Sequence, residues 1–179
     1  CGGSQKAVSA PPGLTFVVIS DDAKKAMHNR KTPIAAFYAN LTIFDGYYEK
    51  KWFPYTMPIS DIYGLRVAFD NIKNDRDILK RHAQVADKVR TTLKEAGFTF
   101  YQNSGFSNTV TVFNVPEGMT ADYILEEMKK RYGIMLAGSF GEFEGKVIRI
   151  GHMGENANEQ DITETLQALE QTLSSLKKK

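Results

Sequence analysis

The sequence predicts an α/β fold that ends in a compact α+β unit, and three observations lead to this prediction. A chain of 179 residues with 42% hydrophobic content is long enough to bury one good core. Short β-rich runs alternate with segments of helical period along the chain. The final segment carries an apolar stripe at steps of four and three residues, which predicts a scaffold helix lying against a sheet. The stripe consists of Ile162, Leu166, Leu169, Leu173 and Leu176.

The first part of the chain predicts one short strand and one short helix. Leu14 to Ile19 is a β-rich run that is apolar on both faces, which predicts a buried strand of the kind found in parallel sheets. Ser20 or Asp21 then caps a brief helix over residues 23–30. From Thr32 to Tyr55 the chain is irregular and rich in aromatic residues, which predicts a contact surface that a partner subunit could cover.

A longer helix comes next, followed by a break in the pattern. Ser60 or a neighbouring residue is the expected helix cap. The expected buried face consists of Ile62, Leu65, Val67, Ala68, Phe69 and Ile72. Residues 71–77 interrupt this pattern, and we place a hinge there. The chain is therefore expected to divide into residues 1–75 and residues 76–179.

The second half predicts a compact unit of alternating helices and strands. The expected elements are a helix over 78–96, strands over 98–101 and 109–115, a helix over 120–132 and a strand over 146–150, ahead of the final helix. Gly97 and Gly133 end the first two of these helices. His82 lies on an apolar helix face and has no second ligand at a useful spacing, so we expect a packed histidine and no metal site.

Composition argues against several classes of function. A formal net charge of +2 is too small to indicate nucleic acid or a membrane surface as a partner, and lysines 177–179 are interpreted as a solvated helix end. No apolar run is long enough for a membrane span. The single cysteine, Cys1, excludes an internal disulfide and favours a reducing, cytoplasmic setting. The glycines at 138, 141 and 145 have neither P-loop nor dinucleotide-binding spacing, so we reject nucleotide binding.

One lysine near the start of the chain is a candidate for chemistry. Lys6 lies between the flexible pair Gly2-Gly3 and the stiffer Pro11-Pro12-Gly13. A loop that holds an amine at a fixed point in a closed site lets that amine capture a carbonyl group. The alternative interpretation is a solvated surface lysine.

Two segments together resemble class V aminotransferases of the alanine–glyoxylate (serine–pyruvate) type. The first is Ser4-Gln5-Lys6 with the prolines and the apolar run that follow; the second is Lys146-Val147-Ile148-Arg149-Ile150-Gly151 after a glycine-containing loop. In that family the matching lysine forms the Schiff base with pyridoxal 5′-phosphate, and the matching arginine clamps the substrate α-carboxylate. The resemblance covers nearly the whole chain and implies these roles for Lys6 and Arg149. A guanidinium fork suits the second role because it bonds both carboxylate oxygens and stays charged.

The same resemblance implies further contacts with the cofactor. Gln5 corresponds to a glutamine that lines the cofactor pocket, and Thr56 to a threonine that reaches the cofactor phosphate of the neighbouring subunit. Phe53 stands where some members carry a phosphate-binding tyrosine, and Tyr55 is therefore a further candidate. Family members carry the aspartate for the pyridine nitrogen, the stacking aromatic residue and the phosphate loop ahead of this part, and none of these lies in the 179 residues.

The fold that the resemblance implies is the C-terminal part of a fold type I transferase. Residues 1–75 would be the C-terminal end of the large cofactor-binding domain with a dimer-contact segment. Residues 76–179 would be the complete small domain. We therefore expect a fragment or cleavage product, in which the strand at 14–19 lacks neighbours to cover it.

The implied activity is transfer of an amino group from a small amino acid, alanine or a serine-like donor, to glyoxylate or pyruvate. The implied partners are these substrates and either a second subunit in a homodimer or the missing N-terminal half. A cysteine desulfurase is a weaker alternative, because Cys1 lies in the wrong place for its mobile nucleophile. A non-catalytic interaction domain that keeps the small-domain fold, and needs a second chain to hold the cofactor, is the other alternative. Its sign would be binding of partner chains through residues 37–55.

Overall fold

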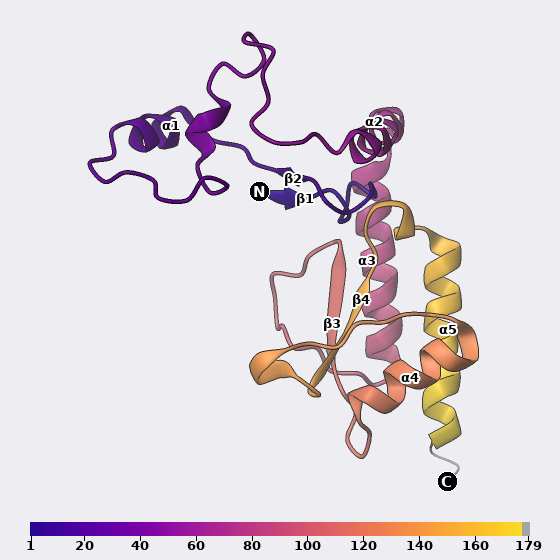
Figure 1. Cartoon of the computed structure of the whole chain (residues 1–179). Helices are drawn as coiled ribbons and strands as arrows, with labels where there is room; N and C mark the ends of the chain where they lie inside the picture. The colour runs from indigo at the N-terminus through magenta and orange to yellow at the C-terminus, as the bar shows by residue number, and fades with distance from the viewer. Residues whose placement is uncertain (177–179) are drawn as a thin grey trace.

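The computed structural model describes residues 1–176, so the interpretation of lysines 177–179 falls outside the described residues. Residues 1–16 lie beside α2, residues 17–58 form an arm that extends to one side, and the C-terminal elements form a compact lobe below α2 (Figure 1). The elements are β1 (Gly2–Gly3), β2 (Thr15–Phe16), α1 (Asp21–His28), the 3₁₀ turn η1 (Leu41–Phe44), α2 (Ile59–Asn74), α3 (Ile78–Glu95), β3 (Val110–Asn114), α4 (Ala121–Tyr132), η2 (Gly141–Phe143), β4 (Val147–Gly151), η3 (Gly154–Asn156) and α5 (Glu159–Leu176).

The predicted strand over Leu14 to Ile19 is wrong in its extent and burial, whereas the expectation that this chain lacks neighbours to cover it agrees with the structure. Only Thr15–Phe16 forms a strand, β2, and it pairs antiparallel with β1. Phe16 packs on Phe69 of α2, with ring centroids 5.6 Å apart, whereas the Val18 side chain is 93% exposed. A strand that is apolar on both faces is buried only when helices cover both of its faces. The described residues supply no such cover for the end of this run.

The brief helix after this strand is confirmed as α1. The Ser20 hydroxyl caps it by accepting a hydrogen bond from the backbone N–H of Ala23 (3.2 Å). Asp21 and Asp22 in the first turn complement the positive end of the helix dipole. At the opposite end of the helix, His28 is half-exposed and lies 3.0 Å from a carboxylate oxygen of Asp45.

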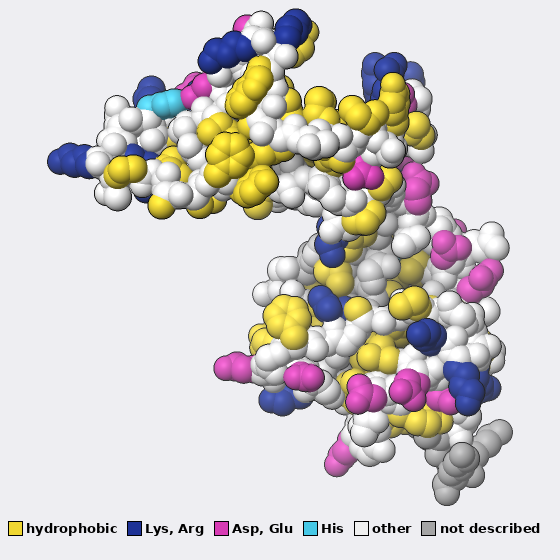
Figure 2. All heavy atoms as spheres, viewed as in Figure 1, with side chains coloured by type: hydrophobic (Ala, Val, Ile, Leu, Met, Phe, Trp, Pro, Cys, Tyr) yellow, Lys and Arg dark blue, Asp and Glu magenta, His cyan; other side chains and the backbone are white. Residues whose placement is uncertain are grey.

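The aromatic segment before α2 is irregular, as predicted, and its rings pack on one another. The Tyr55 ring lies at the centre of this cluster, with centroid distances of 5.0 Å to Tyr38, 5.6 Å to Phe37 and 5.7 Å to Phe44. Several large side chains nevertheless remain exposed, namely Phe37, Tyr38, Tyr47, Tyr48 and Trp52. Figure 2 shows hydrophobic side chains gathered on the surface of the arm. Exposed apolar patches are typical of interaction surfaces in general.

Two details of the α2 prediction are wrong. The helix begins at Ile59 with Pro58 at the N-cap position, so Ser60 lies inside the first turn and provides no cap. Of the six residues expected to be buried, only Ala68 is buried; Ile62, Leu65 and Ile72 are half-buried, and Val67 and Phe69 are exposed. The helical period was read correctly, but burial depends on which neighbours cover each face. The break predicted over residues 71–77 is shorter in the structure: residues 71–74 still belong to α2, and only residues 75–77 separate it from α3.

The C-terminal lobe has one core between a two-stranded antiparallel sheet and three helices. In β3 and β4, Phe113 faces Ile148 and Val112 faces Arg149 across the ladder. Helices α3 and α5 run side by side and α4 packs on α5 (Figure 1). The buried core contains Val85, Val89, Leu93, Phe113, Ala121, Ile124, Met128, Ile148, Ile150, Ile162, Leu166, Ala168 and Leu169.

The predicted elements of this lobe are confirmed with one exception. Thr120 caps α4 by accepting from the N–H of Tyr123 (3.3 Å), and Gly133 ends it in the left-handed conformation. The exception is the predicted strand over 98–101, which is reduced to a single bridge between Phe100 and Phe113. Its backbone leaves the edge of β3 after a few residues, so no continuous ladder forms.

The two histidines of this lobe are buried and hydrogen-bonded. His82 is a packed residue, as predicted: its Nδ1 lies 2.7 Å from the carbonyl oxygen of Ile78, and its Nε2 accepts from the N–H of Gly154 (2.9 Å). His152 is fully buried, and its Nε2 lies 2.8 Å from the hydroxyl of Thr111. Its Nδ1 has no hydrogen-bond partner among the described residues. Burial lowers the pKa of His152 from its ordinary value of 6.5.

We predict that His152 makes the chain less stable as the pH falls. Because its pKa is lower in the folded state, the unfolded chain binds the proton more readily, and the free energy of unfolding falls once the pH drops below about 6.5. His152→Asn, which cannot take up this proton, should show a smaller loss between pH 7.5 and pH 5.5 in urea unfolding. Equal losses in the two proteins would contradict the prediction.

Candidate active site

The first candidate residue, Lys6, lies on a closed loop of residues 4–10, which we call the Lys6 loop. The backbone N–H of Ser9 donates to the Lys6 carbonyl (2.9 Å), and that of Ala10 donates to the Ser4 carbonyl (3.0 Å). Ser4 is fully buried, and its hydroxyl donates to the carbonyl of Pro11 (2.5 Å). The Lys6 side chain is exposed. The loop therefore presents an amine on a backbone that its own hydrogen bonds hold in place.

This loop is held between α2 and the segment that follows β4. A Cβ atom added at Gly64 of α2 would lie 2.8 Å from Pro11, so the end of the loop packs closely on that helix. On the other side, the N–H of Glu155 donates to the hydroxyl of Ser9 (3.0 Å). Both contacts fix the loop from outside, and neither involves the Lys6 side chain.

Arg149 lies in the middle of β4 and is half-buried. Its Nε donates to the carbonyl of Gly138 (2.7 Å), and its backbone pairs with Ala137. Among the described residues, the two terminal nitrogens of its guanidinium form no ion pair or hydrogen bond. The Nε contact orients the fork and leaves four N–H donors available, which is what a carboxylate ligand requires.

The remaining candidates lie on two separate stretches. Gln5 is exposed and lies beside Lys6 in the loop. Tyr55 and Thr56 lie just before α2, and Thr56 is exposed. The Tyr55 hydroxyl is buried without a hydrogen-bond partner among the described residues. No hydrogen bond or ion pair of the described part joins Lys6, Gln5, Tyr55, Thr56 or Arg149 to one another.

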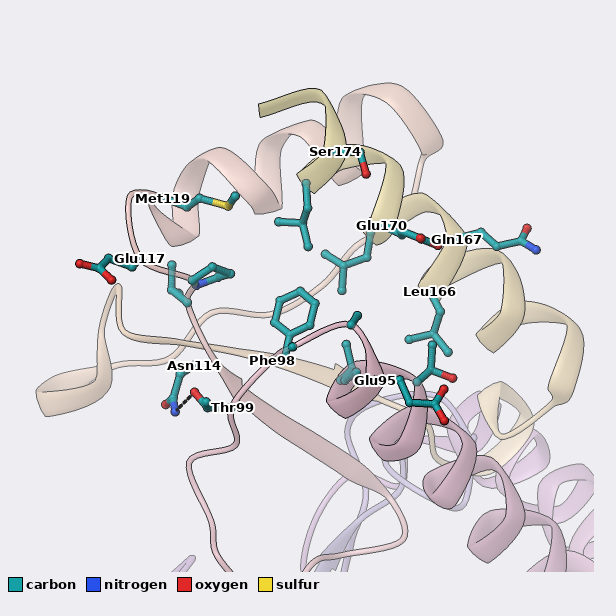
Figure 3. A pocket seen from close by; sticks show the side chains of 18 of the residues that line it. Glu95, Phe98, Thr99, Asn114, Glu117, Met119, Leu166, Gln167, Glu170 and Ser174 are labelled. Carbon is teal, nitrogen blue, oxygen red and sulfur yellow. Dashed lines mark hydrogen bonds between the residues drawn. The ribbon is translucent and has the colours of Figure 1, made fainter. Parts of the chain in front are cut away.

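A large cavity of the described residues lies elsewhere. It has a volume of about 950 Å³ and opens between the end of α3, residues 98–99 and 114–119, and α5 (Figure 3). None of the five candidate residues lines it. Apolar and polar side chains share its walls, and Glu95, Glu117 and Glu170 line it together with one lysine, Lys88. Carboxylates repel a phosphate group, so this cavity does not suit an anionic cofactor.

Several residues that hold the Lys6 loop were not expected from the sequence. Ser4 belongs to the Ser4-Gln5-Lys6 motif, so the sequence could have indicated a structural role for its hydroxyl. Ser9 and Glu155, in contrast, are 146 residues apart and carry no sequence signal that would pair them. His82 was expected to be packed, but its partner Gly154 was not.

No membrane-spanning segment and no metal site are found in the part of the chain that the structure describes. Within residues 1–176, no helix has the length and apolar character needed to cross a bilayer. Over the same residues, no three His, Cys, Asp or Glu side chains group in a way that could hold a metal ion.

Comparisons with known proteins identify the family. No family model matches the chain. The chain is 34% identical over 178 residues to an uncharacterized aminotransferase of Methanocaldococcus jannaschii, covering 97% of this chain and 46% of that protein. It is 32% identical over 187 residues to alanine–glyoxylate aminotransferase of Callithrix jacchus, covering 99% of this chain and 45% of that protein.

A solved structure agrees with these relatives. The crystal structure of an alanine–glyoxylate aminotransferase from Nostoc sp. matches with a TM-score of 0.88 and 26% identity, over 96% of this chain and 46% of that one. The fold is that of a fold type I aminotransferase. The chain belongs to the class V aminotransferases and corresponds to the C-terminal part of their fold. It spans about half the length of the curated relatives it matches.

Proposed function

We propose that the protein containing this chain is a pyridoxal-phosphate-dependent aminotransferase. It would move an amino group from a small amino acid, alanine or a serine-like donor, to glyoxylate or pyruvate. The observation that carries this proposal is the similarity over nearly the whole chain to proteins named as aminotransferases, among them an alanine–glyoxylate enzyme. The lone Cys1, exposed and unable to form an internal disulfide, supports a cytoplasmic location.

The residues present fit two ends of pyridoxal 5′-phosphate. The exposed amine of Lys6, on a loop that its own hydrogen bonds hold in place, is suited to bind the aldehyde carbon. The Tyr55 hydroxyl, which is buried without a partner among the described residues, and the exposed Thr56 hydroxyl suit phosphate oxygens of the cofactor in the neighbouring subunit. Gln5, beside Lys6, would line the same pocket. When bound, this cofactor draws electron density away from the α-carbon of the amino acid and so makes its proton acidic.

Two side chains of this chain would then bind the substrate and transfer its proton. The terminal nitrogens of Arg149 would hold both oxygens of the substrate α-carboxylate, because the Nε contact to Gly138 already orients the fork. The Nζ atom of Lys6 would accept the proton that leaves the substrate α-carbon and later return it, which is general acid–base catalysis. The Lys6 loop would keep that nitrogen within reach of the proton.

The remaining cofactor contacts would come from outside these 179 residues. We propose that the aromatic segment of residues 37–55 is covered by the second subunit of a homodimer or by the N-terminal half, because large exposed apolar side chains gather there. Division of the chain into residues 1–75 and 76–179, at the break between α2 and α3, is part of this proposal.

The proposal is tested by assaying the complete protein for amino transfer. The protein, supplied with pyridoxal 5′-phosphate, is incubated with alanine or serine and with glyoxylate or pyruvate, and the product amino acid is measured. We expect product only when donor and acceptor are both present. If no pair reacts, and partner chains bind through residues 37–55, the chain is a non-catalytic interaction domain instead.

We predict that Arg149→Lys weakens substrate binding. A point charge replaces a two-pronged donor, and we expect a loss of about 1.5 to 3 kcal/mol, equal to roughly a 10- to 150-fold higher KM for the amino acid. The visible absorbance of bound cofactor should be unchanged. Arg131→Lys on α4, whose guanidinium lies near Glu127 and Ser175, is the control and should leave KM as it is. Unchanged kinetics in Arg149→Lys would assign this arginine a structural role.

A further inference from the structure

The Lys6 loop meets the C-terminal lobe at one glycine. A Cβ atom added at Gly154 would lie 1.9 Å from the Ser9 hydroxyl oxygen and 3.0 Å from the Ala7 carbonyl oxygen. Gly154 is buried and has a φ of +61°, a conformation that other residues rarely adopt. Only glycine therefore lets the loop approach this closely.

The contact is made by a strained residue on the loop side. Ser9 has a φ of +56°, which is uncommon for a residue with a side chain. In this conformation its hydroxyl accepts from the N–H of Glu155 (3.0 Å), and its own N–H donates to the carbonyl of Lys6 (2.9 Å). Ser9, which contacts η3, is thus also hydrogen-bonded to the backbone of Lys6. Backbone strain of this kind persists only where the surroundings hold it.

Two residues of helix α3 hold Gly154 in place through hydrogen bonds. The N–H of Gly154 donates to Nε2 of His82, and Nδ1 of the same ring lies against the carbonyl of Ile78. With Nδ1–H donating to that carbonyl, Nε2 is the free acceptor that Gly154 needs. Arg81 adds donors to the carbonyls of Gly154 (3.4 Å) and Ala157 (2.9 Å). Both polar groups of Gly154 are therefore satisfied by the first turns of α3.

We propose that Gly154, held by His82, is a positioning residue that seats the Lys6 loop and so fixes the Lys6 amine for proton transfer. The inference rests on the proposed function, in which Lys6 is the catalytic lysine. Gly154 follows Arg149 by five residues on one continuous segment. In this segment Arg149 binds the substrate carboxylate and Gly154 positions the Lys6 loop. The segment therefore fixes the Arg149 guanidinium and the Lys6 amine relative to each other.

The test uses Gly154→Ala in the complete protein. The control is Gly133→Ala at the end of α4, where φ is +69° and an added Cβ meets nothing within 4 Å. The control carries the same backbone strain and leaves the loop untouched. Ser9→Gly in the Gly154→Ala background is the rescue, because it removes the hydroxyl that the new methyl group would strike and suits a positive φ.

Two measurements distinguish positioning from a general loss of stability. The first is hydrogen exchange at the N–H groups of Ser9 and Ala10 in cofactor-free protein. The second is kcat per folded protein with saturating substrates. We expect Gly154→Ala to accelerate this exchange and to lower kcat about 10- to 100-fold, the effect of a misplacement of about 1 Å. The Gly133→Ala control should do neither. The rescue should move both quantities part of the way back to wild type, because it removes the clash but not the loss of the bond to Glu155.

Each other outcome decides against one proposal or the other. Unchanged hydrogen exchange in Gly154→Ala, or an equal change in Gly133→Ala, would show that Gly154 does not position the Lys6 loop. Faster exchange with unchanged kcat would overturn positioning while the proposed function stands. An inactive wild-type protein would overturn the proposed function, and the exchange and rescue would still decide whether Gly154 seats the loop. If Gly154→Ala does not fold, Ser9→Ala replaces it; this variant removes only the bond to Glu155 and must still accelerate exchange.

Discussion

Replacing Lys6 by alanine in the complete protein is expected to abolish almost all amino-transfer activity. The substitution removes the only candidate group for the covalent attachment and the proton transfer together. Loss of a positioned general acid–base group alone costs about 100- to 10,000-fold in rate. The visible absorbance of lysine-bound cofactor should disappear as well. Spectra and steady-state kinetics of the purified protein measure both effects.

Lys31→Ala is a suitable control for this experiment, because Lys31 is an exposed lysine of the arm. Neither activity nor absorbance should change in this variant. Exogenous primary amines should restore part of the activity to Lys6→Ala if the lost group is an amine that moves a proton. A Lys6→Ala protein with the wild-type spectrum and rate would remove Lys6 from the proposed site.

The largest expected effect on stability comes from Phe113→Ala. Phe113 is fully buried on β3, opposite Ile148, and packs edge-on against Phe98 with ring centroids 5.0 Å apart. Truncating a buried phenylalanine removes its transfer free energy and leaves a cavity, at a cost of about 3 to 5 kcal/mol. We expect this loss in the free energy of unfolding, measured by urea denaturation of the 179-residue chain.

Phe140→Ala is the matched control for this measurement. Phe140 lies between α4 and β4 and is 78% exposed, so its truncation should change stability by less than about 0.5 kcal/mol. If the two substitutions cost the same, the core of the C-terminal lobe is not centred on Phe113.

Local signals in the sequence were sufficient for most of the C-terminal lobe. Thr120 and Gly133 mark the two ends of α4, and the period of the apolar residues identifies α3 and α5. These signals work because capping and helical periodicity depend on residues within about four positions. The strand predicted at 98–101 is only a single bridge, because a strand also needs a partner, and here the partner is β3, which lies beyond the reach of these local signals.

The candidate site was predictable only in part. The motifs around Lys6 and Arg149 carry a family resemblance, and the comparisons confirm the family. The roles of these two residues, and those of Gln5, Tyr55 and Thr56, stay predictions. Nothing in the sequence around Ser9 indicates that its hydroxyl meets the backbone of η3.

The sequence by itself determined the family, the helices of the C-terminal lobe and the candidate lysine and arginine, because each is encoded in a short stretch of residues. Only the tertiary structure decided that Thr15–Phe16 is the only part of the run from Leu14 to Ile19 that forms a strand, and that His152 is buried. It alone brought Ser9 to Glu155 across 146 residues. Burial and long-range contact are properties of the whole packed chain, since each depends on which distant surface covers a residue.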